Sequence, residues 1–182
     1  SELSLEVLNE QCIRDLIEHV IGENPEREEL QETPKRVIKA WKELTAGYKM
    51  RAEDILTLFP CPANHELIVE RDIAFNSTCE HHLMPFEGVA HIGYYPQGKI
   101  IGLSKMPRLV EMHARRLQVQ ERLTSGVAND MQRLTDALGV AVVVQATHCC
   151  VKCRGVGNRS AETITSVFTG KIADKIEEKK DE

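Results

Sequence analysis

The apolar run from Val140 to Val144 is the feature of this sequence that most limits its possible folds. The run is continuous and rich in β-branched side chains, which predicts a strand with both faces buried. An apolar pattern of helical period leads into it and ends at Gly139. The residues of that pattern are Leu123, Val127, Met131, Leu134 and Leu138. A buried strand that follows a long helix predicts a domain built from both a sheet and helices.

Further segments extend this pattern of strands and helices. Apolar residues alternate with polar ones over residues 67–75 (Leu67, Val69, Ile73, Phe75), although Arg71 breaks the alternation. Extended runs recur at residues 89–95 and 163–168, so we expect neighbouring strands in these places. Ser104 is positioned to cap a helix that runs to Arg116.

The N-terminal part of the chain predicts two packed helices followed by a loop. In the first helix the apolar face consists of Leu5, Leu8, Cys12, Leu16 and Val20. Asn24 and Pro25 end this helix, and Thr33 with Pro34 begins a second one that stops at Gly47. Prolines interrupt residues 48–65, which we expect to form a loop.

Composition excludes several classes of function. The chain has 182 residues, 42% of them hydrophobic, enough to bury a core within one domain. A formal net charge of -5 and an aromatic content of 4% argue against binding to nucleic acid or to an anionic membrane. No apolar stretch reaches the roughly 18 residues that span a bilayer, and no secretory signal is visible. We therefore expect a cytoplasmic protein.

The cysteines and histidines predict a metal site. Cys79 and His82 are two residues apart, a spacing that lets both bind one ion. His148, Cys149 and Cys150 follow the predicted buried strand. Strand alternation would place His148 and Cys150 on one face and Cys149 in the core. With Cys79, His82 and Cys150 as ligands, a zinc ion keeps a fourth position for water, which favours hydrolysis.

Other interpretations of these residues stay open at this point. Cys150 and Cys153 form a C-x-x-C pair, which is also typical of structural zinc sites and redox pairs. His81 is equally compatible with a plain surface position. Each cysteine taken singly is more often a core residue than a ligand.

Two groups of polar residues are candidates for binding an anion and a base. Ser104, Lys105 and Arg108 lie at a predicted helix N-terminus, where backbone N–H groups attract phosphate oxygens. A second basic group follows the predicted ligands and consists of Lys152, Arg154 and Arg159. A solvated basic face explains both groups as well. Glu121 is either an exposed helix carboxylate or an acceptor for a guanine edge.

In four segments, in this order, the chain resembles the GTP cyclohydrolase I family. These are Ser77-Thr78-Cys79-Glu80-His81-His82, Gly102-Leu103-Ser104-Lys105, Gln118-Val119-Gln120-Glu121-Arg122 and His148-Cys149-Cys150-Val151-Lys152-Cys153-Arg154-Gly155. The resemblance extends from Thr33 to about Gly170. It implies an α+β tunnelling fold, with an antiparallel four-stranded sheet and helices on one face. The implied parts are an N-terminal helical hairpin (1–48), the catalytic domain (49–170) and a charged tail (171–182).

The resemblance also implies an activity and an assembly. Members of the family use Zn²⁺ to hydrolyse the purine ring of GTP, which releases formate and gives 7,8-dihydroneopterin triphosphate, the first step of pterin and folate biosynthesis. Their pentameric rings stack into a homodecamer, and each active site lies at a subunit boundary.

Residue roles carry over from the same segments. Cys79, His82 and Cys150 correspond to the zinc ligands, and His81 and His148 to residues that transfer protons. Ser104 assists the ribose steps, while Glu121 with Gln120 holds the guanine edge. The triphosphate is bound by Lys105, Arg108 and Arg154, with Arg36 from a neighbouring subunit.

One departure from the family pattern leaves two other functions to consider. Cys149 and Cys153 flank the third ligand where the family is expected to have other residues. One alternative is a tunnelling-fold nitrile reductase of queuosine biosynthesis, which uses a nucleophilic cysteine and no zinc. The other is a noncatalytic zinc-binding module in which the extra cysteines complete the coordination.

Overall fold

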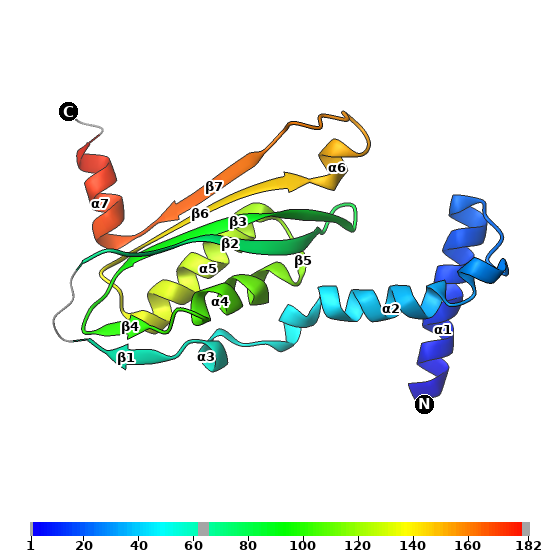
Figure 1. Cartoon of the computed structure of the whole chain (residues 1–182), viewed down its shortest axis with the longest axis horizontal. Coiled ribbons are helices and arrows are strands. Elements are labelled where there is room, and N and C mark those ends of the chain that lie inside the picture. Colours follow the sequence, from blue (N-terminus) through cyan, green and yellow to red (C-terminus); the bar gives the residue numbers. More distant parts are fainter. Residues whose placement is uncertain (1, 62–65, 180–182) are drawn as a thin grey trace. The chain divides into compact units, whose positions relative to one another are not determined.

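The protein is described by a computed structural model that covers residues 2–61 and 66–179, with side chains from Asn9 onward. The chain divides into two compact units, residues 1–45 and residues 46–182 (Figure 1). Among the described residues, none of the helices combines the length and apolar character that spanning a bilayer requires.

The N-terminal unit is built from two helices, as predicted. Helix α1 (Glu2–Asp15) continues into a π-helical turn, η1 (Leu16–Ile21), which ends at Gly22 with a φ of 81°. After a short 3₁₀ turn, η2 (Glu28–Leu30), helix α2 (Thr33–Leu44) begins with a proline in its first turn. Helices α1 and α2 contact each other.

The predicted apolar face of the first helix is wrong in its second half. Leu16 and Val20 are 44% and 76% exposed, whereas Ile17 is buried. The π-helical turn contributes at Val20, because its wider spacing rotates the side chains that follow it away from the face set by a 3.6-residue period. Cys12 precedes this turn and is exposed as well. Leu5 and Leu8 belong to the same predicted face, and their side chains lie outside the described residues.

The second unit contains a five-stranded sheet in the order β5-β2-β3-β6-β7 (Figure 1). The four long strands β2 (Ile68–Cys79), β3 (Met84–Tyr95), β6 (Gly139–His148) and β7 (Thr163–Phe168) are antiparallel. The expected α+β fold with an antiparallel four-stranded sheet is confirmed. A short strand, β5 (Leu117–Gln118), adds a parallel edge that the sequence did not predict.

Helices α4 (Lys105–Ala114) and α5 (Gln120–Thr135) contact the sheet and bury one of its faces. The core between them contains fully buried Leu109, Leu123 and Val127 from the helices and Ile92 and Val142 from the strands. Helix α5 ends at Asp136, in the left-handed region, three residues before the predicted stop. Gly139 is instead the first residue of β6.

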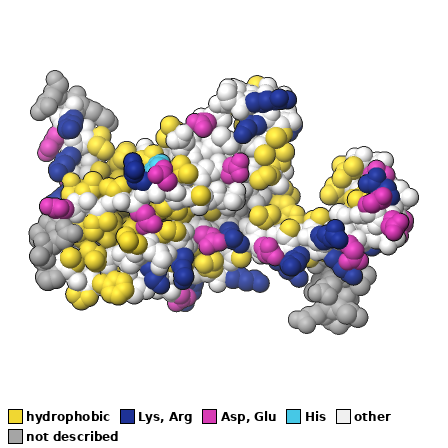
Figure 2. Space-filling model, viewed as in Figure 1, with side chains coloured by type: hydrophobic (Ala, Val, Ile, Leu, Met, Phe, Trp, Pro, Cys, Tyr) yellow, Lys and Arg dark blue, Asp and Glu magenta, His cyan; other side chains and the backbone are white. Residues whose placement is uncertain are grey.

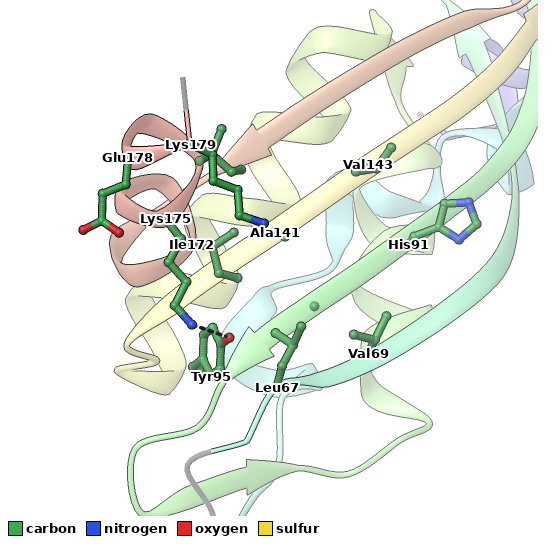
Figure 3. A pocket seen from close by; sticks show the side chains of 12 residues that line it. Leu67, Val69, His91, Tyr95, Ala141, Val143, Ile172, Lys175, Glu178 and Lys179 are labelled. Atoms are coloured by element: carbon green, nitrogen blue, oxygen red, sulfur yellow. Dashed lines mark hydrogen bonds between the residues drawn. The ribbon is translucent and has the colours of Figure 1, made fainter. Parts of the chain in front are cut away.

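The opposite face of the sheet is not covered along its whole length. Val140, Val142 and Val144 are fully buried, but Ala141 and Val143 are only half-buried, so the prediction of a strand buried on both faces is wrong. Ala141 and Val143 line a groove of about 490 Å³ between the sheet and the C-terminal helix (Figure 3). The other apolar side chains of the groove are Leu67, Val69, Ile172 and Ile176.

A β-bulge in β2 explains why residues 67–75 do not all face the core. The register shifts between Glu70 and Ile73, and Asp72 has a φ of 59°. The extra residue reverses the alternation of side chains. Val69 therefore faces the groove and is 51% exposed, whereas Ile73 is buried. Figure 2 shows hydrophobic side chains gathered near the C-terminal helix on the visible face of this unit.

Two segments contain regular structure that was not expected. The predicted loop holds a 3₁₀ turn, η3 (Ala46–Lys49), a short helix, α3 (Ala52–Ile55), and β1 (Leu58–Pro60), which pairs with β4 (Lys99–Ile101). Most of the charged tail forms helix α7 (Gly170–Glu178), and residues 180–182 lie outside the described residues. Lys175 of α7 donates a hydrogen bond to the Tyr95 hydroxyl at 3.2 Å (Figure 3).

A partly buried hydrogen bond between side chains ties α4 to α5. His113 Nε2 lies 2.8 Å from a carboxylate oxygen of Asp130, which also accepts a hydrogen bond from Arg133 at 2.7 Å. The His113 ring packs against Gly126, where a Cβ atom would meet the ring. Burial lowers the pKa of His113 below its ordinary value of 6.5, although the hydrogen bond to Asp130 acts in the opposite direction.

The lowered pKa of His113 predicts a pH-dependent stability. At pH values between the folded and the unfolded pKa of His113, the unfolded chain binds more protons than the folded chain. The contribution of neutral His113 to the free energy of unfolding is therefore complete above about pH 6.5 and is lost as the pH falls below that value. We expect His113→Gln to weaken this dependence between about pH 8 and pH 5. Urea unfolding at several pH values measures it, with His19→Gln as an exposed-histidine control. If the free energy of unfolding of the His113 variant depends on pH as steeply as that of the unmodified protein, His113 is not the group responsible.

Candidate metal centre

The last residues of β2 and β6 and the first residues of β3 lie together at one end of the sheet, and they bring the predicted metal residues to the same place. Cys79 is paired with Met84 at the end of β2, and Phe86 is paired with His148 at the end of β6. The turn between β2 and β3 is closed by a hydrogen bond from Leu83 N–H to Cys79 C=O at 2.9 Å. Leu83 has a φ of 54°, the left-handed conformation of a tight turn.

The three predicted ligands form one cluster. The ligand atoms of Cys79, His82 and Cys150 all lie within 4.8 Å of one another. Cys79 Sγ lies 3.9 Å from His82 Nδ1. Two sulfurs bound to one tetrahedral zinc at about 2.3 Å would be roughly 3.8 Å apart, so the cluster is close to the size that such an ion requires. This donor set fits a metal cofactor.

Cys150 reaches the cluster from a helix, and not from the strand. Strand β6 ends at His148, and Cys149–Lys152 form a short helix, α6. The prediction that Cys150 lies on the strand is therefore wrong, although Cys150 does lie beside Cys79. Cys149 is half-buried and was wrongly expected in the core. Its thiol is hydrogen-bonded to that of Cys153, one helical turn further on.

The electrostatics of the cluster favour a bound cation. Burial raises the pKa of the Cys150 thiol, and the neighbouring Cys79 thiol raises it further. Two thiolates this close together repel each other in the absence of a positive charge. A divalent cation removes that penalty, because coordination deprotonates the thiols that bind it.

His148 lies beside the cluster in a fixed orientation. Its ring stacks on Phe86 with a centroid distance of 4.6 Å and an interplanar angle of 11°. Its Nε2 atom lies 2.9 Å from Gln120 Oε1. Burial lowers the pKa of His148, and the Glu121 carboxylate acts in the opposite direction.

The two residues at the start of α5 point in different directions. Gln120 is 2% exposed, and its side-chain amide bonds within the protein to Val144 C=O, Thr163 C=O and Thr165 Oγ1. Glu121 is exposed and interacts electrostatically with His148. The structure thus places a free carboxylate at the first turn of a helix, next to the candidate metal centre.

A bidentate ion pair joins α5 to the metal turn (residues 80–83, between β2 and β3), and no pattern in the sequence predicts it. Arg122 donates to both carboxylate oxygens of Glu80, at 2.6 and 3.1 Å, and lowers the pKa of Glu80. Glu80 N–H also donates to Gln118 C=O at 3.0 Å. His81, the next residue, is largely exposed, and its Nε2 lies 4.0 Å from Glu80.

Ser104, Lys105 and Arg108 are not brought to the metal cluster within one chain. They lie at the N-terminus of α4, just after Ile101, whose N–H donates to the Tyr94 hydroxyl at 2.9 Å. Helix α4 has 10 residues, roughly 15 Å in length, and it ends at Ala114, whose C=O accepts a hydrogen bond from Ser77 near the end of β2. The α4 N-terminus therefore lies about one helix length from the end of β2 that carries Cys79 (Figure 1).

The remaining predicted anion-binding residues are exposed. Arg154 follows α6 near the cluster, and Arg36 lies on α2 of the N-terminal unit. Ser104 occupies the N-cap position of α4 without a side-chain capping bond.

Known proteins are similar to this chain over most of its length. A family model described as GTP cyclohydrolase I matches residues 9–181. A GTP cyclohydrolase 1 from Campylobacter jejuni is 50% identical over 163 residues, 88% of this chain and 85% of the relative. A GTP cyclohydrolase 1 from Streptomyces coelicolor is 46% identical over 167 residues, 91% of this chain and 83% of the relative.

A solved structure is also similar, at a much greater distance. The archaeosine synthase QueF-Like in its apo form has a TM-score of 0.47 and 15% sequence identity, covering 57% of this chain and 93% of that one. The family assignment rests on the closer matches. Because the family model spans almost the whole chain and relatives about half identical cover most of it, this chain belongs to the GTP cyclohydrolase I family of enzymes.

Proposed function

We propose that this enzyme uses Zn²⁺ to hydrolyse the purine ring of GTP, releasing formate and giving 7,8-dihydroneopterin triphosphate, the first step of pterin and folate biosynthesis. The observation that carries the proposal is the cluster of Cys79, His82 and Cys150. Its three donor atoms leave a fourth tetrahedral position open, as in catalytic zinc sites. Membership of the GTP cyclohydrolase I family supplies the substrate.

The chain's own residues would hold the metal and move the protons. Cys79, His82 and Cys150 would bind the zinc, which supplies a Lewis acid that activates water for attack on the purine C8. His148 is fixed beside the cluster and His81 is exposed to solvent. We assign both imidazoles to proton transfer, because they are the histidines next to the ligands in sequence or in space.

Recognition of the base is assigned to the start of α5. The exposed Glu121 carboxylate accepts two hydrogen bonds from the N–H groups of the guanine edge. Charge-assisted hydrogen bonds of this kind discriminate strongly against bases that lack the donors. The resemblance assigns Gln120 to the same subsite, but its side-chain amide is bonded to protein groups, so we assign contact with the guanine edge to Glu121.

The triphosphate is assigned to Lys105, Arg108, Arg154 and Arg36, and the ribose steps to Ser104. Since Ser104 and Lys105 lie about the length of α4 away from the cluster in the same chain, we infer that a complete site takes the α4 N-terminus of another subunit. This requirement supports a homo-oligomer with active sites at subunit boundaries. The decamer of two stacked pentameric rings satisfies it.

The activity is tested by incubating the purified chain with GTP. We expect formate together with a product that becomes a fluorescent pterin after oxidation. Treatment with a chelator should abolish both signals, and added Zn²⁺ should restore them, because the ligands would be left without their ion. Intact GTP after incubation of the zinc-loaded enzyme would refute the proposal, and turnover that survives complete metal removal would refute its zinc dependence.

The ligand set is tested by replacing the clustered cysteines one at a time. Cys150→Ser should lose bound zinc and lower turnover by at least about 100-fold, since loss of a ligand costs more than loss of its supporting groups. The matched controls are Cys149→Ser and Cys153→Ser, which should keep both properties. Metal analysis and the formate assay measure them. Zinc lost from a control but kept by Cys150→Ser would reverse the assignment.

The shared site is tested by mixing two inactive variants. Cys150→Ser lacks a metal ligand, and the double variant Ser104→Ala, Lys105→Ala lacks the proposed residues of the α4 N-terminus. When both chains are unfolded and refolded together, some sites combine an intact half from each chain, so part of the activity should return. Each variant refolded alone serves as the control. If the mixture stays as inactive as its components, the site lies within one chain.

A further inference from the structure

We propose that Gln120 is a positioning residue that fixes the orientation and the tautomer of His148, so that the neutral ring carries its hydrogen on Nε2 and leaves Nδ1 free. The importance of this for turnover rests on the proposed function. The hydrogen-bond geometry itself does not depend on it. Gln120 acts here through another residue, which is a different role from contact with the guanine edge.

The orientation of the Gln120 amide follows from its partners. Its Nε2 atom lies 3.0 Å from Val144 C=O and 2.9 Å from Thr163 C=O. Carbonyl oxygens accept hydrogen bonds and never donate them, so the atom that faces them must be the NH₂ group. A flipped amide would place its oxygen against two carbonyl oxygens in a site that is 2% exposed.

Two threonines support the same orientation. Thr124 Oγ donates to Gln120 C=O at 2.8 Å, which uses its single hydrogen. Thr165 Oγ1 lies 2.6 Å from Thr124 Oγ1 and must therefore be the donor in that bond. With its own hydrogen used, Thr165 can only accept from Gln120 Nε2, at 3.2 Å. The two hydrogens of the Gln120 NH₂ group are shared among three acceptors, the two carbonyl oxygens and Thr165 Oγ1, and no acceptor in this group has to donate.

The position of Gln120 Oε1 then determines the state of His148. This oxygen lies 2.9 Å from His148 Nε2 and can only accept, so Nε2 must carry a hydrogen. In a neutral imidazole the other nitrogen, Nδ1, is then the acceptor. Stacking on Phe86 at 4.6 Å fixes the plane of the ring. The ring therefore has one orientation and one available nitrogen.

The bonds that anchor the Gln120 side chain hold it rigidly, because they join three elements of the fold. Gln120 lies on α5, Val144 on β6 and Thr163 on β7, so the amide is held by two adjacent strands of the sheet. Loss of this anchor frees the ring to rotate and to change tautomer. Misplacement of a reacting group by about 1 Å can cost on the order of 100-fold in rate.

The test compares two glutamines of the same helix. Gln120→Met keeps the length of the side chain but removes the acceptor for His148. The matched control is Gln132→Met, because Gln132 Nε2 donates to Ala137 C=O at 2.7 Å and its Oε1 accepts from Thr169 at 2.7 Å, away from the metal cluster. We expect Gln120→Met to lower kcat for GTP at least about tenfold while KM changes by less than about threefold.

The control separates positioning from a general loss of stability. Gln132→Met should lower the unfolding temperature by a similar amount and keep kcat within about twofold of the unmodified enzyme. Equal losses in kcat for both methionine variants, or none for Gln120→Met, would overturn the proposal.

A spectroscopic measurement tests the tautomer even if a variant fails to fold. In the unmodified protein labelled with ¹⁵N-histidine, the two nitrogens of the neutral His148 ring give distinct chemical shifts. The His148 signals are identified by their loss in His148→Asn. The hydrogen should be on Nε2, and a hydrogen on Nδ1 would overturn the proposal. Absence of formate from GTP would instead count against the proposed function.

Discussion

The antiparallel pairing of β3 with β6 is the interaction on which the rest of the structure depends. It runs without a register shift from Phe86 and His148 to Tyr95 and Gly139. The two strands approach closely at Gly88, where a Cβ atom would meet the backbone of Gln145 and Ala146. Since β2 is paired with the other side of β3, this register determines which residues meet at the end of the sheet. Cys79, His148 and the start of α6 meet there for that reason.

Much of the fold could be predicted from the sequence because its apolar periods are local. Helices α4 and α5 and strands β6 and β7 appear near their expected positions, and the core between them comes from the same residues. What could not be predicted depends on single backbone events. The bulge at Asp72 reverses the faces of β2, and the π-helical turn after Asp15 rotates the end of the first helix. Neither event changes the local composition, so apolar periodicity alone does not predict the bulge or the π-helical turn.

The candidate site was predictable where its residues are close in sequence, and less so where they come from distant segments. The C-x-x-H spacing pointed to Cys79 and His82, and Cys150 was named from an incorrect strand argument. Phe86 and His148 are joined only through strand register, which no short pattern reveals. The family resemblance assigned Gln120 to the guanine edge together with Glu121, yet helical geometry turns consecutive side chains about 100° apart. One of the two is therefore buried and the other is exposed.

The ion pair between Glu80 and Arg122 has a consequence for how the site can move. Arg122 directly follows Glu121 on α5, and Glu80 lies between two of the clustered ligands on the metal turn. With the bond from Glu80 N–H to Gln118 C=O, the turn and the helix start are connected through both side chain and backbone. The turn that carries two of the clustered ligands and the helix turn that carries Glu121 are therefore held together by one connected set of bonds.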